Sequence, residues 1–482
     1  MSTSRARCKN VRFLVGKADK STYFYAEKAD KCMINRKIDK RIADYYAEHK
    51  GALLITGARQ IGKTYSIREY AKANYENFLD IDFISQPELV GLFDGANGAQ
   101  DMLLRLSAVS DVPLVPGKTF VFFDEVQKYP DIVTMIKFLV EEGSYRYAMS
   151  GSLLGVELND LRSEPVGYMD VFDMYPLDLE EFCRAVGVAP EVLEHLRACY
   201  ESGRKIDEVV HKRMMRVFLL YLVVGGMPDA VSKYIETNNI RQVVEAQKAI
   251  IHLYKRDISQ YDPDDKLYLD EIFDLIPSEL NEKNKRFILK DLNENFKFGR
   301  FKNSFLWMKN AGVAIPVFNV DEPRYPLRLA EQRNLFKLFQ NDVGLLACQY
   351  SNDVQIKLLR GEVNMNYGAV FENFAAQELL AHGFDLFYFN SKSQGEIDFV
   401  LQKGEKVLPV EIKSGKDYTR HSALDNVLSN EVYSIEKGIV FGSDNVNHEG
   451  RITYYPIYLL MFLENSSAPL PEQYTLDLTG IS

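Results

Sequence analysis

The stretch that decides the fold is Ala52-Leu53-Leu54-Ile55-Thr56-Gly57-Ala58-Arg59-Gln60-Ile61-Gly62-Lys63-Thr64. Its first five residues form an apolar run that is typical of a buried parallel strand, and a helical pattern follows from Tyr65 to Tyr75. Gly57 and Gly62 let the backbone wrap around an anion, and the helix near Lys63 points its positive end at the same place. A strand, a GxxxxGKT loop and a helix in this order predict a phosphate-binding loop.

This loop predicts that the protein binds ATP and Mg²⁺. We expect Lys63 to act catalytically by contacting the β and γ phosphates, and the Thr64 hydroxyl to bind Mg²⁺. The backbone N–H groups of the loop would surround the phosphates. The expected nucleotide-binding residues are Gly57, Ala58, Arg59, Gln60, Ile61, Gly62, Lys63, Thr64 and Tyr65.

A second motif supports the first. Phe120-Val121-Phe122-Phe123 is an apolar strand, and Asp124 and Glu125 follow it at the edge where ligands bind in parallel sheets. Asp124 is expected to help hold Mg²⁺, and Glu125 to polarise the attacking water. At the end of the strand 145–150, either Ser150 or Ser152 could contact the γ-phosphate or the water, and an ordinary serine turn is equally consistent with the pattern.

Alternating strands and helices over residues 34–185 predict a three-layer α/β domain. Further strands are expected at 78–83 and 170–175, and a helix at 34–49. The length of 482 residues predicts roughly two to four domains. Residues 1–32 are polar and basic without a clear period, which fits either a disordered extension or an over-long start.

Composition excludes several classes of protein. The net charge of −10 argues against a polybasic binder, although it leaves room for a local basic patch. The five cysteines form no CxxC pair, so a disulfide framework or a zinc ribbon is not indicated and a reducing cytoplasm is the expected location. No uncharged segment reaches the ~18 residues that span a bilayer, so no membrane association is expected.

Four segments together resemble the prokaryotic AAA-type P-loop ATPases that carry a C-terminal domain of unknown function 4143. They are GARQIGKT (57–64), FFDEVQKYPD (122–131), the SGS turn (150–152) and YPLDLEEF (175–182), and the resemblance extends over residues 33 to about 440. It implies a P-loop NTPase sandwich over 33–200, a helical winged-helix region over 201–330 and a restriction-endonuclease-like α/β domain over 331–482. Many relatives carry a Gly-Arg or Gly-Lys pair before the YPL segment, but Tyr168 follows Gly167 here and Arg162 is out of register. An arginine finger is therefore not assigned, and weak hydrolysis or a nucleotide switch becomes the expectation.

The middle region suggests a winged helix-turn-helix, with helical patterns at 281–296 and 301–310 before an apolar strand at 313–317. Such a unit could place a helix in the DNA major groove, or it could pack as a lid against the ATPase domain. The second helix carries few basic residues, which favours the lid because exposed cations dominate affinity for DNA.

A second constellation lies near the C-terminus, where Glu372 falls on a helix at 367–381, Asp398 on a strand at 395–401, and Glu411 and Lys413 on a strand at 407–413. The pattern resembles the PD-(D/E)xK nuclease-like fold. Glu411 and Lys413 would point to the same face of their strand, and Asp398 would meet Glu411 across a hairpin. The resemblance implies Glu372, Asp398 and Glu411 as ligands of a divalent cation and Asp398, Glu411 and Lys413 as catalytic residues.

The sequence therefore predicts an ATPase whose nucleotide state controls a nuclease-like, DNA-binding module. A metal-dependent nuclease with regulatory ATP binding is one alternative. A non-cleaving, nucleotide-switched scaffold that grips DNA or a protein partner is the other. The local cations Lys392, Lys403, Lys406, Lys416 and Arg420 would suit a phosphate backbone.

Overall fold

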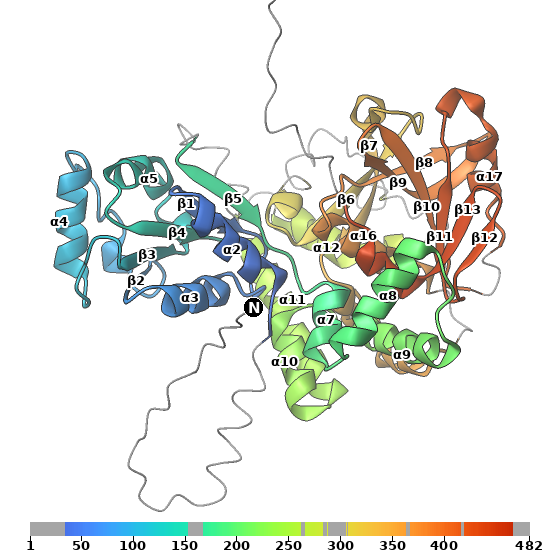
Figure 1. The fold of residues 1–482 in the computed structure, drawn as a ribbon, viewed down its shortest axis with the longest axis horizontal. Helices are drawn as coiled ribbons and strands as arrows, with labels where there is room; N and C mark the ends of the chain where they lie inside the picture. Colours follow the sequence, from blue (N-terminus) through green and yellow to red (C-terminus); the bar gives the residue numbers. More distant parts are fainter. Residues whose placement is uncertain are drawn as a thin grey trace, which may run out of the picture.

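The computed structural model describes residues 34–152, 167–261, 266–282, 287, 305, 307–362, 367–415 and 419–465. Two sheets lie at opposite ends of the molecule, and helices of the middle region lie between and beside them (Figure 1). The extension expected at residues 1–32 lies outside the described part of the chain.

The first sheet is parallel and has the order β2-β3-β4-β1-β5. Its central strands are buried on both faces, as their apolar sequences predict. The five strands predicted from the sequence are confirmed with small shifts at their ends: β1 (Ala52–Thr56), β2 (Asn77–Asp82), β3 (Thr119–Asp124), β4 (Arg146–Ser150) and β5 (Met169–Asp173).

Helices cover both faces of this sheet, so the predicted three-layer sandwich is confirmed. Leu53 shares a core with Ile67 of α3, and its neighbour Leu54 shares a separate core with Ile136 of α5, because successive side chains of a strand point to opposite faces. On the first face lie α2 (Lys37–Glu48) and α3 (Lys63–Asn74), and on the second lie α4 (Ala99–Val109) and α5 (Asp131–Glu142).

The middle region is helical, as expected. Gly225 ends the apolar helix α9 with φ +72°, a conformation that favours glycine. Within the expected bounds of 201–330, the described helices include α9 (Glu208–Val224), α10 (Pro228–Thr237), α11 (Ile240–Tyr261) and α12 (Lys266–Asn281). Helices α7 (Leu179–Ala185) and α8 (Pro190–Ser202) begin before these bounds, and α14 (Val343–Gln349) and α15 (Asn352–Arg360) follow them. Most of the predicted winged helix, at 283–286, 288–304 and 306, lies outside the described residues, so it stays a prediction.

The second sheet has the order β12-β13-β11-β10-β9-β8-β6-β7 and mixes parallel with antiparallel pairs. The predicted hairpin is confirmed, since Lys403 at the end of β9 pairs with Lys406 at the start of β10. The sheet begins at Ala314, before the boundary expected at residue 331, because β6 pairs with both β7 and β8. Its strands are β6 (Ala314–Val320), β7 (Glu331–Gln340), β8 (Phe387–Ser391), β9 (Gly395–Lys403), β10 (Lys406–Ile412), β11 (Gly438–Gly442), β12 (Asn447–Glu449) and β13 (Ile452–Pro456).

Two helices pack on opposite faces of this second sheet. On one face, α16 (Gly368–Ala381) shares a core with Phe399, and on the other face, α17 (Ser422–Ser429) shares a core with Val400. The core under α16 is continuous with the core of the first sheet, and it includes Ala58 of the phosphate-binding loop and Val343 of α14. The two sheets are therefore joined by a common apolar interior.

Candidate functional site

The loop between β1 and α3 has the backbone that a phosphate-binding loop requires. Gly57 and Gly62 have φ values of +128° and +98°, which side chains other than glycine rarely adopt. The buried Lys63 ammonium donates to the carbonyls of Gly57 at 2.9 Å and Ala58 at 2.7 Å. Burial lowers the pKa of Lys63 to about 8, although Glu125 and Asp124 favour its charged form. The predicted lysine thus lies inside the loop.

Thr64, Asp124 and Ser150 meet at the carboxyl edge of the first sheet. The Thr64 hydroxyl donates to Oδ2 of Asp124 at 2.8 Å, and the Ser150 hydroxyl donates to Oδ1. Burial raises the pKa of Asp124, and the two hydroxyl donors oppose that shift. A hydroxyl and a carboxylate side by side are the oxygen donors that Mg²⁺ prefers, so the residues present fit this ion.

Glu125 follows at the same edge in a left-handed conformation, with φ +57°. Its carboxylate accepts from the amide of Gln127, and the Ser152 hydroxyl lies 3.4 Å from Oε2. Of the two serines left open by the sequence, Ser150 contacts Asp124 and Ser152 contacts Glu125. Both lie at the site, with different partners.

The contacts that α11 makes with the loop were not predicted. The Arg59 guanidinium donates to Oδ1 of Asp257 on α11 at 2.9 Å, and also to the Ser152 hydroxyl at 3.2 Å. The Tyr254 hydroxyl donates to the carbonyl of Arg59 at 3.2 Å and accepts from the Asn341 amide at 3.1 Å. Arg59 and Asp257 are 198 positions apart, and no local pattern links them.

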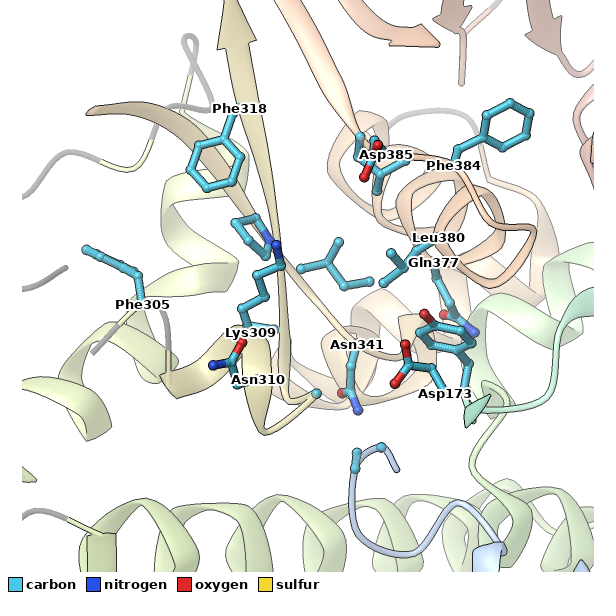
Figure 2. Close-up of a pocket in the computed structure, with 18 of the residues that line it drawn as sticks. Asp173, Phe305, Lys309, Asn310, Phe318, Asn341, Gln377, Leu380, Phe384 and Asp385 are labelled. Atoms are coloured by element: carbon cyan, nitrogen blue, oxygen red, sulfur yellow. The ribbon is translucent and has the colours of Figure 1, made fainter. Parts of the chain in front are cut away.

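A cavity of about 620 Å³ adjoins this junction. Thr56, Gly57 and Ala58 line it, together with Asp173 and Asn341. Figure 2 shows the Asp173 and Asn341 side chains at its end near the loop. Its lining does not include Lys63, Thr64 or Asp124, so the cavity lies beside the predicted phosphate site.

The YPLDLEEF segment follows the first sheet and contacts helix α16 of the C-terminal domain. Asp178 caps α7 by accepting from the backbone of Glu181 at 2.8 Å, which explains the helix start in this motif. The backbone N–H of Leu179 donates to the buried Glu378 of α16 at 2.8 Å. Burial raises the pKa of Glu378 to about 8. Arg162, which could not be assigned as a finger, lies outside the described residues.

In the second sheet, the predicted acid and lysine residues do lie close together. Oδ2 of Asp398 accepts from the backbone of Ile412 at 2.9 Å, which places β9 against β10. The Lys413 ammonium lies 2.9 Å from Oε2 of Glu411 on the same side of its strand. Burial raises the pKa of Glu411 to about 8, and Asp398 adds to that effect.

A lysine that the sequence reading missed lies among these acids. Lys337 of β7 is fully buried, and its ammonium lies 3.6 Å from Glu372, 2.7 Å from Glu396 and 3.9 Å from Asp398. Nearby acids outweigh the effect of burial and raise the pKa of Lys337. The signal available in the sequence was a lysine within the apolar run Phe336-Lys337-Leu338-Phe339.

The residues present do not fit the divalent cation expected here. Within the described part of the chain, no group of three or more His, Cys, Asp or Glu side chains is placed to hold a metal ion. The assignment of Glu372, Asp398 and Glu411 as ligands of a divalent cation stays a prediction.

The local cations are only partly available to a ligand. Lys392 and Lys403 are exposed, whereas Lys406 pairs with Glu436 at 2.9 Å. Arg420 is exposed, and Lys416 lies outside the described residues.

Comparison with known families assigns one domain in the first half of the chain. A family model described as an AAA domain matches residues 49–183, which include the loop, Asp124 and the serine turn. Residues 49–183 therefore contain an AAA-type P-loop ATPase domain. Two models described as domains of unknown function, DUF8612 and DUF4143, match residues 215–355 and 367–460. The nuclease-like architecture inferred for the C-terminal domain is not among these descriptions.

Several solved structures are similar to parts of the chain. The Walker-type ATPase paby2304 of Pyrococcus abyssi is 12% identical, with a TM-score of 0.41 over 66% of this chain and 96% of its own. The Aeropyrum pernix ORC1 protein in complex with DNA is 12% identical, with a TM-score of 0.29 over 68% and 93%. A Thermotoga maritima RuvB variant is 13% identical, with a TM-score of 0.30 over 61% and 90%. No curated protein matches the chain significantly. Among the described residues, no helix is both long and apolar enough to cross a bilayer.

Proposed function

We propose that the protein is a Mg²⁺-dependent ATP hydrolase whose nucleotide state is transmitted from the AAA domain to the C-terminal sheet. The observation that carries the proposal is the contact of Thr64 with Asp124 at 2.8 Å, next to a lysine enclosed by its loop. At one edge of the sheet, this arrangement supplies what a nucleoside triphosphate needs: backbone N–H groups and the lysine ammonium for the phosphates, and oxygen donors for Mg²⁺.

Each predicted residue then has a role. The backbone of the loop from Gly57 to Tyr65 holds the phosphates, and Lys63 neutralises charge on the β and γ groups. Thr64 and Asp124 would hold Mg²⁺, which supplies charge neutralisation when bound. Glu125 orients the attacking water, and Ser150 fixes the carboxylate of Asp124.

The contacts of Arg59 support transmission of the nucleotide state. Arg59 lies in the phosphate-binding loop. It contacts Asp257 of α11 directly and is linked through Tyr254 to Asn341, the residue that follows β7. A change in the loop on loss of the γ-phosphate would alter these bonds, and a switch requires such differential contacts. The expected target of the switch is a DNA-binding C-terminal module.

The central test is ATP turnover by the full chain with Mg²⁺, with and without duplex DNA. We expect Lys63→Ala to lose nucleotide binding and Glu125→Gln to bind ATP without hydrolysing it. Glu88→Gln is the matched control, because Glu88 is an exposed acid of the same domain and should leave turnover unchanged. Turnover that survives in Glu125→Gln, or none in the unaltered chain, would contradict the proposal.

Transmission is tested separately by hydrogen exchange with a non-hydrolysable ATP analogue and with ADP. Residues 240–261 and 331–341 should differ in protection between the two nucleotides, because α11 contacts the loop and Asn341 contacts Tyr254 of α11. A difference in protection that is confined to residues 57–65 would be compatible with the ATPase assignment. It would refute transmission of the nucleotide state to the C-terminal sheet.

The observation on Lys337 favours a non-cleaving scaffold over a metal-dependent nuclease as the second candidate function. For a nuclease, Asp398, Glu411 and Lys413 would be the catalytic residues. Incubation of the full chain with plasmid DNA in Mg²⁺ or Mn²⁺ distinguishes the two, since cleavage that Lys413→Ala abolishes would establish the nuclease.

A further inference from the structure

The positively charged side chain of Lys337 lies among three of the acids of the C-terminal domain. Lys337 is fully buried, and its ammonium lies within 4 Å of Glu372, Glu396 and Asp398, which come from α16 and β9. It also lies 5.1 Å from the centre of the Tyr388 ring, a contact that stabilises a cation. A buried ammonium in this position satisfies the acids that a metal ion would otherwise have to neutralise.

Three other oxygens of the predicted ligand set also have partners. Oδ1 of Asp398 faces Lys337 at 3.9 Å, and Oδ2 accepts from the backbone of Ile412 at 2.9 Å. Oε2 of Glu411 pairs with Lys413 at 2.9 Å. Mg²⁺ requires oxygens at about 2.0–2.1 Å in a nearly octahedral arrangement, so each of these three oxygens would have to leave its present partner to bind it.

Electrostatics oppose the simultaneous presence of both cations. A divalent ion bound by Glu372 and Asp398 would lie within a few ångströms of the Lys337 ammonium, in an interior where like charges are poorly screened. The lysine cannot withdraw to solvent, because β7 pairs with β6 along its length and the side chain is fully buried.

We propose that Lys337 permanently occupies the place of the divalent cation, so that the unaltered C-terminal site binds no metal and cannot cut nucleic acid by metal-dependent chemistry. This inference does not depend on the ATPase proposal. In this role, the fixed charge of Lys337 positions the side chains of Glu372, Glu396 and Asp398.

The first test counts Mn²⁺ ions bound by the full chain without nucleotide, from the loss of the free-ion electron paramagnetic resonance signal. The unaltered protein and Asp398→Asn should bind the same number, whatever the AAA domain contributes. An ion that the unaltered protein holds and Asp398→Asn releases would overturn the proposal. This comparison is informative even if substitution of Lys337 prevents folding.

The second test removes the ammonium. Lys337→Met keeps a long apolar side chain and should gain one Mn²⁺ site, which the added substitution Asp398→Asn should abolish. The melting temperature of Lys337→Met should rise with Mn²⁺, whereas that of the unaltered protein should not. Lys403→Met is the matched control, because Lys403 is an exposed lysine of the same sheet and should gain no site. A folded Lys337→Met protein without a new site would refute the role of this lysine.

Discussion

Addition of one methyl group at Gly57 should strongly weaken nucleotide binding, because the methyl group would collide with neighbouring atoms. A Cβ at this position would lie 2.2 Å from the carbonyl oxygen of Met174 and 2.8 Å from Cδ1 of Ile61. The oxygen belongs to the backbone that follows β5 and cannot rotate away, so Gly57→Ala must displace the loop or the end of that strand.

The size of the effect follows from two contributions. A residue other than glycine at φ +128° bears strain on the order of 1–3 kcal/mol, and displacement of packed backbone adds to it. A total of about 3 kcal/mol in the binding-competent conformation corresponds to a loss of about 100-fold in affinity. The assay is fluorescence anisotropy of a labelled ADP with Mg²⁺.

The matched control is Gly98→Ala. Gly98 also has a positive φ, +85°, but no heavy atom lies within 4 Å of an added Cβ. This variant carries the backbone strain without the clash, and it lies away from the loop, so its affinity for ADP should not change. A folded Gly57→Ala protein that binds ADP within about threefold of the unaltered chain, less than 1 kcal/mol, would refute the reasoning.

Three further outcomes are expected. Ser150→Ala removes a hydroxyl that donates to Asp124, and it should slow ATP turnover about 10- to 100-fold in a phosphate-release assay. Ser152→Ala should have a smaller effect. Equal turnover in the two variants would contradict the role of Ser150 in fixing Asp124. Arg59→Ala and Asp257→Asn should show a coupling of about 1–3 kcal/mol in a double-mutant cycle on nucleotide affinity, and additive effects would exclude transmission through this pair. Asp342 is the buried residue that caps the N-terminus of α14, and burial raises its pKa from 3.8 to about 6. Between these two pH values the folded chain retains a proton that the unfolded chain releases. The free energy of unfolding should therefore fall by up to about 3 kcal/mol as pH rises from about 4 to 6. Asp342→Asn should flatten that part of the profile of melting temperature against pH, and parallel profiles would contradict the cause.

The sequence was informative where a signal was local. The strands of the first sheet, the helix after the loop and the β9–β10 hairpin all follow from apolar periodicity and turn residues, which depend on near neighbours. Thr64 was predicted from the GxxxxGKT motif, and Asp124 from the rule that parallel strands gather their carboxyl ends at one edge. The two side chains are in contact at 2.8 Å.

Other features depend on contacts between distant segments and could not be predicted in this way. In the sequence, Lys337 resembles an ordinary strand residue, and only folding brings the acids of β9 and α16 to its side chain. The pairing of Arg59 with Asp257 depends on how α11 crosses the loop, which no periodicity encodes. The start of the second sheet at Ala314 could not be predicted for the same reason, since β6 is identified by its partners β7 and β8.

The common interior of the two halves has a consequence for how such proteins can change over generations. Ala58 of the loop and Val343 beside the second sheet belong to one apolar core, so neither half has a closed surface of its own on that side. A recombination event that exchanged the AAA domain alone would expose this apolar interior to water. Selection would then act against the resulting protein. The ATPase and the C-terminal sheet should therefore be inherited together, and their facing residues should vary in concert across a lineage.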